Sequence, residues 1–267
     1  MKLVKSIVTN NPCYKAGRTI TVKGLMLHSV GCPQPKASVF VNQFNKSSYD
    51  RACVHAFIDA NDGTIYQTLP WNHRGWHGGG ASNNTHIGVE MCEPNCIKYS
   101  GGSTFTCSNL AKAQEMVTRT YNSAVELFAD LCKQYKLNPL TDIISHSEGY
   151  KKGIATNHGD PEHLWKGVKL PYTMDTFRSD VKSKMNGDIT PITPTTSANT
   201  ETSTTFKVRV SITNLNVRKG AGLSFGVVGL CPKGVYTIVE TKTKNGYEWG
   251  KLKSGMGWIA LKYTQRL

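Results

Sequence analysis

A threonine-rich segment divides this chain into two parts. Residues 187–205, GDITPITPTTSANTETSTT, contain eight threonines and two prolines but no aromatic residue. A segment of this composition is too polar to bury and is typical of a linker, extended near its prolines and flexible beyond them. We therefore expect two separately folded domains, residues 1–186 and 206–267.

Charge is distributed unevenly over these parts. The net charge is +14, with +7 in residues 1–186, −2 in the linker and +9 in residues 206–267. Such an excess indicates a polyanionic partner, for which nucleic acid, an acidic membrane and an anionic cell wall all qualify. The chain has no stripe of aromatic and basic residues and no helix-turn-helix pattern, which disfavours nucleic acid. No apolar stretch approaches the length of a membrane span.

The cysteines and the amino terminus point to a reducing compartment. The first residues, MKLVKSIVTNNPCYKAGRT, lack the apolar run of a signal peptide, so we expect synthesis in the cytoplasm. The eight cysteines form no CxxC pair and no zinc-finger spacing. Most are expected to be free, small core residues, with a Cys92–Cys96 or Cys96–Cys107 disulfide as the alternative.

Apolar periodicity predicts an α/β fold for the large domain. Helical spacing is most regular from Leu110 to Tyr135, which predicts one long amphipathic helix. The turn Asn61-Asp62-Gly63 between two apolar runs predicts a hairpin. Strands that alternate with helices indicate a central mixed sheet flanked by helices. The predicted strands are 24–28, 53–59, 64–69, 86–92 and 141–146, and the predicted helices are 36–46, 110–135 and 174–185.

Histidines at two predicted strand ends suggest a metal site. His28 ends the first of these strands and His146 ends the strand after the long helix, while Asp160 follows in NHGDPEHLW, residues 157–165. Side chains at strand ends leave the packed interior of an α/β sheet and converge on a crevice. Two imidazoles and a carboxylate with an open fourth position form a catalytic zinc site. A single such histidine is more often a packing residue, but the combination favours a metal.

Several separated motifs resemble one enzyme family. LMLHSVG, HAFIDANDGTIYQTLPWNHRGWHGGG, HIGVEM and ISHSEGYKKGIATNHGDPEHLW occur in the order expected of type 2 N-acetylmuramoyl-L-alanine amidases. That zinc family includes phage lysins and is similar to the peptidoglycan recognition proteins. The resemblance covers about residues 20–170. It implies a central sheet flanked by helices, with zinc in a surface groove.

The resemblance also implies roles for individual residues. It assigns zinc to His28, His146 and Asp160, catalysis to Glu90 and His158, and substrate contact to Trp76 and His77. His158 stands where the family often has lysine, so its charge depends on pH where that of lysine would not. Glu162 stands where glycine often follows the Asp-Pro step, which puts the local turn in question.

The implied reaction is zinc-dependent hydrolysis of the amide bond between N-acetylmuramic acid and L-alanine in peptidoglycan. Glu90 would accept a proton from the attacking water, and His158 would help to stabilise the oxyanion. The alternative for Glu90 is a buried strand carboxylate paired with a basic residue. Among the other histidines, we expect His55 and His163 to support the site or to pack, and His73 and His86 to lie on the surface.

Residues 206–267 alternate short β-rich runs with glycine turns, as a small barrel requires. They resemble the bacterial SH3-like domains, in which LNVR opens the fold (here 215–218), Gly-Trp precedes the last strand (257–258) and a tyrosine closes it (Tyr263). Tyr247 and Trp249 are expected either to be structural or to contact a wall peptide or glycan.

Two other function classes remain. In a Cys-His wall endopeptidase, Cys107 ahead of the long helix would act with His146, but Asp160 and Glu90 would then have no role. A non-catalytic peptidoglycan-binding protein of this fold typically lacks the third ligand, which is present here. An amidase joined to a wall-binding domain without a signal peptide looks like a phage or prophage endolysin. Such an enzyme accumulates in the host cytoplasm and acts on the cell wall after release. Its partners would be peptidoglycan and, through the basic domain, anionic wall polymers.

Overall fold

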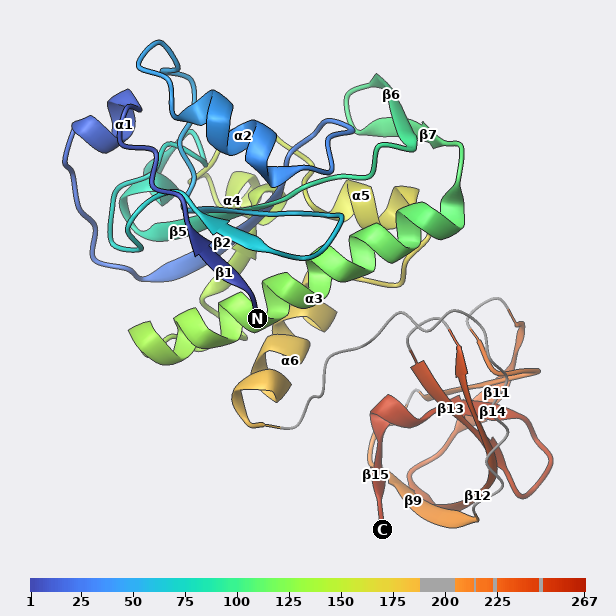
Figure 1. The fold of residues 1–267 in the computed structure, drawn as a ribbon. Coiled ribbons are helices and arrows are strands. Elements are labelled where there is room, and N and C mark those ends of the chain that lie inside the picture. Colours follow the sequence, from blue (N-terminus) through green and yellow to red (C-terminus); the bar gives the residue numbers. More distant parts are fainter. Residues whose placement is uncertain (188–204, 214, 223–224, 245–246) are drawn as a thin grey trace. The chain divides into compact units, whose positions relative to one another are not determined.

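The computed structural model describes residues 1–187, 205–213, 215–222, 225–244 and 247–267 (Figure 1). The chain divides into two compact units, residues 1–191 and 192–267. Apart from Gly187 and Thr205, the predicted linker lies outside the described residues.

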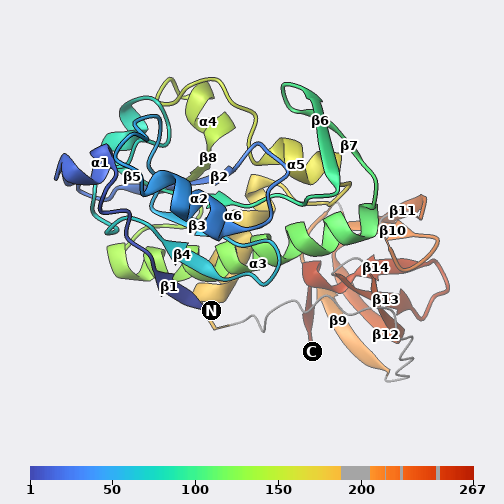
Figure 2. The ribbon, with the colours of Figure 1, turned by 45° about the horizontal axis from the view of Figure 1, so that its top comes forward.

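A six-stranded mixed sheet forms the centre of the N-terminal unit, in the order β1-β4-β3-β5-β2-β8 (Figure 2). Its strands are β1 Leu3–Lys5, β2 Gly24–Ser29, β3 Ala56–Ile58, β4 Ile65–Gln67, β5 His86–Met91 and β8 Ile143–Ser145. β2 pairs in parallel with both β5 and β8, whereas β3 and β4 are antiparallel. The predicted central mixed sheet is confirmed, and the carboxyl ends of β2, β5 and β8 meet at one edge.

Helices cover both faces of this sheet (Figure 1). Along β3, Ala56 and Ile58 pack into the apolar cluster that contains α3 (Leu110–Tyr135) and α6 (Met174–Met185), while Phe57 packs into a second cluster with α2 (Ala37–Phe44). Alternate residues of a strand point to opposite faces, which explains this division. The helices are α1 Pro12–Lys15, α2 Ala37–Phe44, α3 Leu110–Tyr135, α4 His146–Lys151, α5 Glu162–Gly167 and α6 Met174–Met185, with a short 3-10 helix at Ala81–Asn84.

The long helix α3 has the bounds that its periodicity predicts. Its N-cap is Asn109, whose side chain accepts a hydrogen bond from the backbone N–H of Lys112 at 3.0 Å. Its C-cap is Lys136, which adopts a left-handed conformation with φ 57°. α6 is joined to α3 by a 2.8 Å hydrogen bond from Tyr121 Oη to Asp180 Oδ2. The two helices α3 and α6 pack together in the apolar core on one face of the sheet.

This unit contains two hairpins. The predicted turn at residues 61–63 joins β3 to β4, with Ile58 opposite Ile65. A second hairpin, β6 Ile97–Gly101 with β7 Thr104–Cys107, forms a separate two-stranded sheet that the sequence patterns did not predict. Its alternation of apolar and polar residues is too short to stand out, because each strand has only four or five residues.

The C-terminal unit contains a seven-stranded, all-antiparallel sheet in the order β11-β10-β14-β13-β12-β9-β15. Its elements are β9 Phe206–Val210, β10 Leu215–Arg218, β11 Val227–Cys231, β12 Gly234–Lys244, β13 Tyr247–Leu252, β14 Trp258–Ala260, a 3-10 helix at Leu261–Tyr263 and β15 Thr264–Arg266. The expected second, all-β unit is therefore confirmed. Trp249 is only 1% exposed and its indole N–H donates to the Lys244 carbonyl, so it is a core residue.

No described helix combines the length and the apolar character that crossing a membrane requires.

Each unit has its own apolar core, which predicts independent folding. The clusters of the first unit and those of the second contain residues of one unit only. We expect fragments 1–186 and 206–267, expressed separately, each to unfold cooperatively at the midpoint that it shows in the whole chain. Calorimetry of both fragments and of the whole chain checks this. A fragment without a cooperative transition would contradict the division.

Candidate functional site

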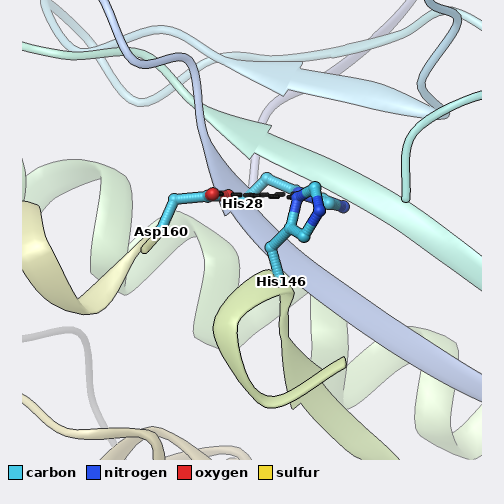
Figure 3. A group of neighbouring side chains, drawn as sticks. All are labelled: His28, His146 and Asp160. Atoms are coloured by element: carbon cyan, nitrogen blue, oxygen red, sulfur yellow. Dashed lines mark hydrogen bonds and ion pairs between the residues drawn. The ribbon is translucent and has the colours of Figure 1, made fainter. Parts of the chain in front are cut away.

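Three side chains from distant parts of the sequence converge at the carboxyl ends of the parallel strands (Figure 3). His28 lies near the end of β2, and His146 is the first residue of α4, directly after β8. Asp160 reaches the same place from the loop ahead of α5. Because β2 and β8 pair in parallel, both histidines leave the sheet at one edge. The structure thus brings together the three residues expected to bind metal.

Their polar atoms have the spacing of metal ligands. His28 Nδ1 lies 3.1 Å from His146 Nδ1 and 3.2 Å from Asp160 Oδ2. His146 Nδ1 lies 3.7 Å from Asp160 Oδ1. Ligand atoms at bonding distance from a tetrahedral zinc ion are about 3.3–3.4 Å apart. All three side chains are buried, and their donor atoms fit one ion.

The electrostatics of the cluster favour a cation. Burial lowers the pKa of His28. A hydrogen bond with Asp160 and the charges of Glu90 and Asp160 raise this pKa by more than burial lowers it, so the net shift is upward. Burial and the positive charge of His28 lower the pKa of His146 to about 4. Burial raises the pKa of Asp160, yet both histidines lower it more, and the carboxylate stays ionised. The raised pKa of His28 and the lowered pKa of Asp160 both indicate that this cluster stabilises positive charge.

A hydrogen-bond relay determines which nitrogen of His28 faces the cluster. His77 Nε2 lies 3.0 Å from the backbone oxygen of His86, which can only accept, so this nitrogen carries the proton. Burial and the nearby positive charges of His28 and His55 lower the pKa of His77, which keeps the ring neutral and makes its Nδ1 an acceptor. His28 Nε2, 3.1 Å from that Nδ1, must then donate. The relay holds the outer proton of His28 and directs Nδ1 toward the cluster.

A second relay does the same for His146. Thr156 Oγ1 donates to the backbone oxygen of Gly78 at 3.3 Å. A hydroxyl has one proton, so in its 3.2 Å contact with His146 Nε2 the threonine oxygen accepts. His146 therefore also turns Nδ1 toward the cluster. Nothing in the sequence patterns singled out Thr156, because its partners lie 10 and 78 residues away.

Both relays depend on close approach to glycine. A Cβ atom at Gly88, on β5, would lie 2.3 Å from His77 Cγ. A Cβ atom at Gly79 would lie 2.5 Å from Thr156 Cγ2. Contacts this short are not tolerated, so any larger residue would displace the relay side chains.

Glu90 lies next to His28 on the adjacent strand, since the two residues are paired in the parallel β2–β5 ladder. Burial raises the pKa of Glu90 to about 7; the charge of His28 opposes this shift, and those of Asp160 and Glu93 add to it. Its Oε2 is buried and has no hydrogen-bond partner among the described residues. A buried carboxylate oxygen in this state indicates a functional group rather than a structural one.

The remaining predicted site residues occupy different environments. His158 is exposed, and its ring lies against that of His146, with Nδ1 3.3 Å from His146 Nε2. Trp76 is half-buried and packs against the second apolar cluster. His77 is buried with both ring nitrogens bonded to protein groups, so neither nitrogen remains for the expected substrate contact.

The other four histidines clarify the surroundings. His73 is 6% exposed and bonds through Nε2 to the Cys13 carbonyl, so its expected surface position was wrong. His86 is partly buried. His55 is buried between the His73 carbonyl and the Gly88 N–H, a packing role. His163 Nε2 lies 2.7 Å from Tyr99 Oη.

Cys107, the alternative nucleophile, lies on β7 beside Cys96. The hydrogen-bond contacts of the His146 ring in the described structure go to His28, Thr156 and His158, with Asp160 nearby as an ion pair. The structure therefore offers no support for a Cys107–His146 pair.

Glu93 and Tyr99 form a second buried group that the sequence did not reveal. Glu93 accepts hydrogen bonds from the Gly31 N–H at 3.0 Å and from Tyr99 Oη at 2.8 Å. Tyr99 also contacts His163, three residues after Asp160. This group connects the β6–β7 hairpin to the loops around the site.

Comparison with known proteins agrees with this geometry. Residues 18–163, more than half of the chain, match the family described as N-acetylmuramoyl-L-alanine amidase. A probable N-acetylmuramoyl-L-alanine amidase of Bacillus licheniformis is 23% identical over 223 residues, covering 82% of this chain and 58% of that protein. The N-acetylmuramoyl-L-alanine amidase BlyA of Bacillus subtilis (strain 168) is 24% identical over 257 residues, covering 88% of this chain and 64% of that protein. The chain thus spans about 60% of the length of these curated relatives.

The fold is also found among solved structures. The hydrolase AmiA of Staphylococcus aureus, solved in complex with its ligand, aligns with a TM-score of 0.53 at 20% identity, covering 72% of this chain and 88% of that one. This likeness shows a shared fold.

The relay through His77 predicts a loss of metal affinity when it is broken. His77→Gln removes the neutral ring that accepts from His28 Nε2, so the His28 ring is no longer held. We expect zinc to bind about 10- to 100-fold more weakly. Competition against a coloured chelator measures this without any assay of activity. His73→Gln, which alters a buried histidine outside the cluster, is the matched control. Equal affinities in both variants and the parent protein would contradict the relay.

Proposed function

The chain belongs to the N-acetylmuramoyl-L-alanine amidase family, and from that premise we propose that it hydrolyses the amide bond between N-acetylmuramic acid and L-alanine in peptidoglycan. The observation that carries the proposal is the buried cluster of His28, His146 and Asp160 with Glu90 on the adjacent strand. A binding protein would need neither a metal-ligand set nor a carboxyl group held at a pKa of about 7.

Zinc is the ion that the donor set suits best. Two imidazole nitrogens and one carboxylate oxygen are typical ligands of catalytic zinc, which leaves a fourth position open. When bound there, zinc would supply a Lewis acid that activates water and polarises the substrate carbonyl. The side chains that hold it are themselves held by His77 and Thr156, which keep both Nδ1 atoms in place.

Glu90 is the proposed general base. It lies beside the cluster, and its pKa of about 7 allows it to accept a proton near neutral pH. Its partnerless Oε2 can receive that proton without breaking an existing hydrogen bond. The same carboxyl group would then deliver the proton to the amine of the departing L-alanine, which leaves poorly unless protonated.

His158 and Trp76 would handle the substrate. His158 is exposed at the side of His146, so its ring can donate to the oxygen that becomes negatively charged during attack. Trp76 is half-buried and adjoins His77 in sequence, where its exposed part can line the substrate groove. Asp160 supports a catalytic role over a receptor role, because it completes the ligand set.

We further propose that the C-terminal unit is an SH3-like domain that holds the protein on the wall by charge. Residues 206–267, which contain its described strands, carry a net charge of +9. Lysines lie over its aromatic rings: Lys244 Nζ is 5.1 Å from the Phe225 ring centre, and Lys242 and Lys251 are 5.5 and 5.9 Å from that of Trp258. A positive charge of this size favours anionic polymers as the ligand. An amidase joined to such a unit would act as an endolysin of phage or prophage origin.

Removal of zinc is expected to abolish lysis. Phenanthroline should inactivate the protein and added zinc should restore it, and replacing His28, His146 or Asp160 with alanine should leave no measurable turnover. The assay is the release of new L-alanine amino termini from purified walls. Cys107→Ser, which tests the peptidase alternative, should remain active. Full activity in a metal-free preparation would refute the proposal.

Glu90→Gln is expected to keep the zinc and the fold but to lose about 100-fold or more of turnover, because the amide cannot accept a proton. Glu93→Gln is a matched control, since burial also raises the pKa of Glu93 to about 7 but its carboxyl oxygens already accept hydrogen bonds from the Gly31 N–H and from Tyr99 Oη. It should lose far less.

The same base predicts a dependence on pH. Glu90 must be ionised to act, so kcat/KM should rise with pH until the pH exceeds the pKa of Glu90. That pKa is about 7 without metal, and the charge of a bound ion would move it lower. A pH profile of the parent protein measures this rise. If Glu90→Gln showed unchanged turnover, the base would be another group.

Wall binding by the C-terminal unit should weaken as salt rises, because exposed charges interact over a Debye length of about 8 Å at physiological ionic strength. The test titrates labelled Glu90→Gln protein onto purified walls, native or stripped of anionic polymer. Removal of the anionic polymer should abolish most of the binding. The double variant Lys244→Gln/Lys262→Gln should bind more weakly than the control double variant Lys112→Gln/Lys133→Gln, whose changes lie in the other unit. Binding that survives both stripping and salt would indicate a specific pocket instead.

A further inference from the structure

The segments that carry His146 and Asp160 are joined by a hydrogen bond between two side chains. Ser145, the last residue of β8, precedes His146, and its Oγ donates to Glu162 Oε1 at 2.7 Å. Glu162 is the first residue of α5 and follows Asp160 by two positions. Ser145 is fully buried and Glu162 is half-buried. One short bond therefore connects close neighbours of two candidate ligands.

The direction of this bond is determined by the start of α4. The backbone N–H of Glu148 donates to Ser145 Oγ at 3.0 Å, so this oxygen caps the helix as an acceptor. The single proton of the hydroxyl group then points to Glu162, whose carboxylate can only accept. Hydrogen bonds from a hydroxyl group to a carboxylate are shorter and stronger than those between neutral groups, which agrees with the distance of 2.7 Å.

Ser145 is in turn held by an ion pair between α4 and α6. Its backbone N–H donates to Glu148 Oε2 at 3.0 Å. Arg178 donates to both carboxyl oxygens of Glu148, at 2.9 and 3.0 Å, and to the carbonyl of Ile143 on β8 at 3.1 Å. A bidentate pair of this kind fixes orientation as well as distance. Ser145 is therefore a rigid point to which Glu162 attaches the Asp160 segment.

The contacts that Asp160 makes with the backbone of β2 and α4 are longer than this bond. The backbone N–H of Ser147 donates to the Asp160 carbonyl at 3.3 Å, and that of Ser29 donates to Asp160 Oδ2 at 3.4 Å. Hydrogen bonds of this type usually measure about 2.7–3.2 Å, so both are weak. The bond from Ser145 to Glu162 is thus better suited to fix the Asp160 segment against the start of α4.

We propose that Glu162 is a positioning residue: through Ser145 it fixes the spacing of His146 and Asp160 and so raises the affinity of the site for zinc. The inference rests on the proposed zinc site. Ligands that are fixed before an ion binds lose less conformational freedom when it binds, and groups that hold ligands contribute to affinity in this way. Glu162 thus has a role at the position where the amidase family often has glycine, and the turn still brings Asp160 into the cluster.

The test measures the zinc affinity of the full-length protein by competition with a coloured chelator, which requires no activity. In Glu162→Ala the Asp160 segment loses its bond to Ser145, so we expect zinc to bind about 10-fold more weakly. The matched control is Glu126→Ala, which removes another half-buried carboxylate, bonded to Lys184 at 2.9 Å between α3 and α6. It should bind zinc as tightly as the parent protein. Equal affinities in all three proteins would overturn the inference but not the zinc site, whereas a parent protein that binds no zinc would overturn both.

A double-mutant cycle tests whether Glu162 acts through Ser145. Ser145→Ala should weaken zinc binding at least as much as Glu162→Ala, because it also removes the cap of α4 next to His146. In the Ser145→Ala background, Glu162→Ala should cause little further loss. Losses that multiply would show that Glu162 acts independently of Ser145 and would overturn the proposed connection.

Melting of the metal-free proteins separates positioning from a general structural role. A contact that only stabilised the fold would lower the melting temperature of metal-free Glu162→Ala and leave its zinc affinity unchanged, and that result would overturn the inference. We expect instead weaker zinc binding in a variant that still unfolds cooperatively.

Discussion

Two imidazole nitrogens and one carboxylate oxygen, all buried, face one another within about one tetrahedral edge in this structure. Three such atoms repel each other through their lone pairs unless a proton or a metal cation lies among them. The surrounding structure maintains this arrangement at the ends of strands β2 and β8, where the two histidines leave the sheet together. The polar groups around the cluster accordingly keep the three side chains in position for a cation.

Backbone carbonyls orient His28 and His146 through intermediate side chains. A carbonyl oxygen can only accept, so it determines the direction of every hydrogen bond that leads to it. His86 and Gly78 provide such oxygens, and His77 and Thr156 transmit their effect to His28 and His146. Each relay requires a glycine where its side chain passes the backbone.

The two units use charge differently. In the first, buried groups such as Glu90 and Glu93 have pKa values raised to about 7, so their protonation responds near neutral pH. In the second, Lys242, Lys244 and Lys251 lie over aromatic rings, and the proposed role of the unit depends on the total positive charge rather than on one group. The first arrangement suits proton transfer at one place, and the second suits adhesion over a surface.

The local patterns of the sequence determined the long helix, the hairpin turn at residues 61–63, the all-β second unit and the positions of His28 and His146 at strand ends. These features depend on neighbouring residues, since periodicity and turn chemistry act over a few positions. Only the tertiary structure decided that His77 supports His28, that Thr156 supports His146 and that His73 is buried. Those outcomes depend on partners 49, 10 and 60 residues away, whose approach is set by the strand order and by glycine at two crossings. The tertiary structure also determined the β6–β7 hairpin. Its strands are too short to show a sequence pattern, and contacts with Glu93, His163 and α5 hold them in place.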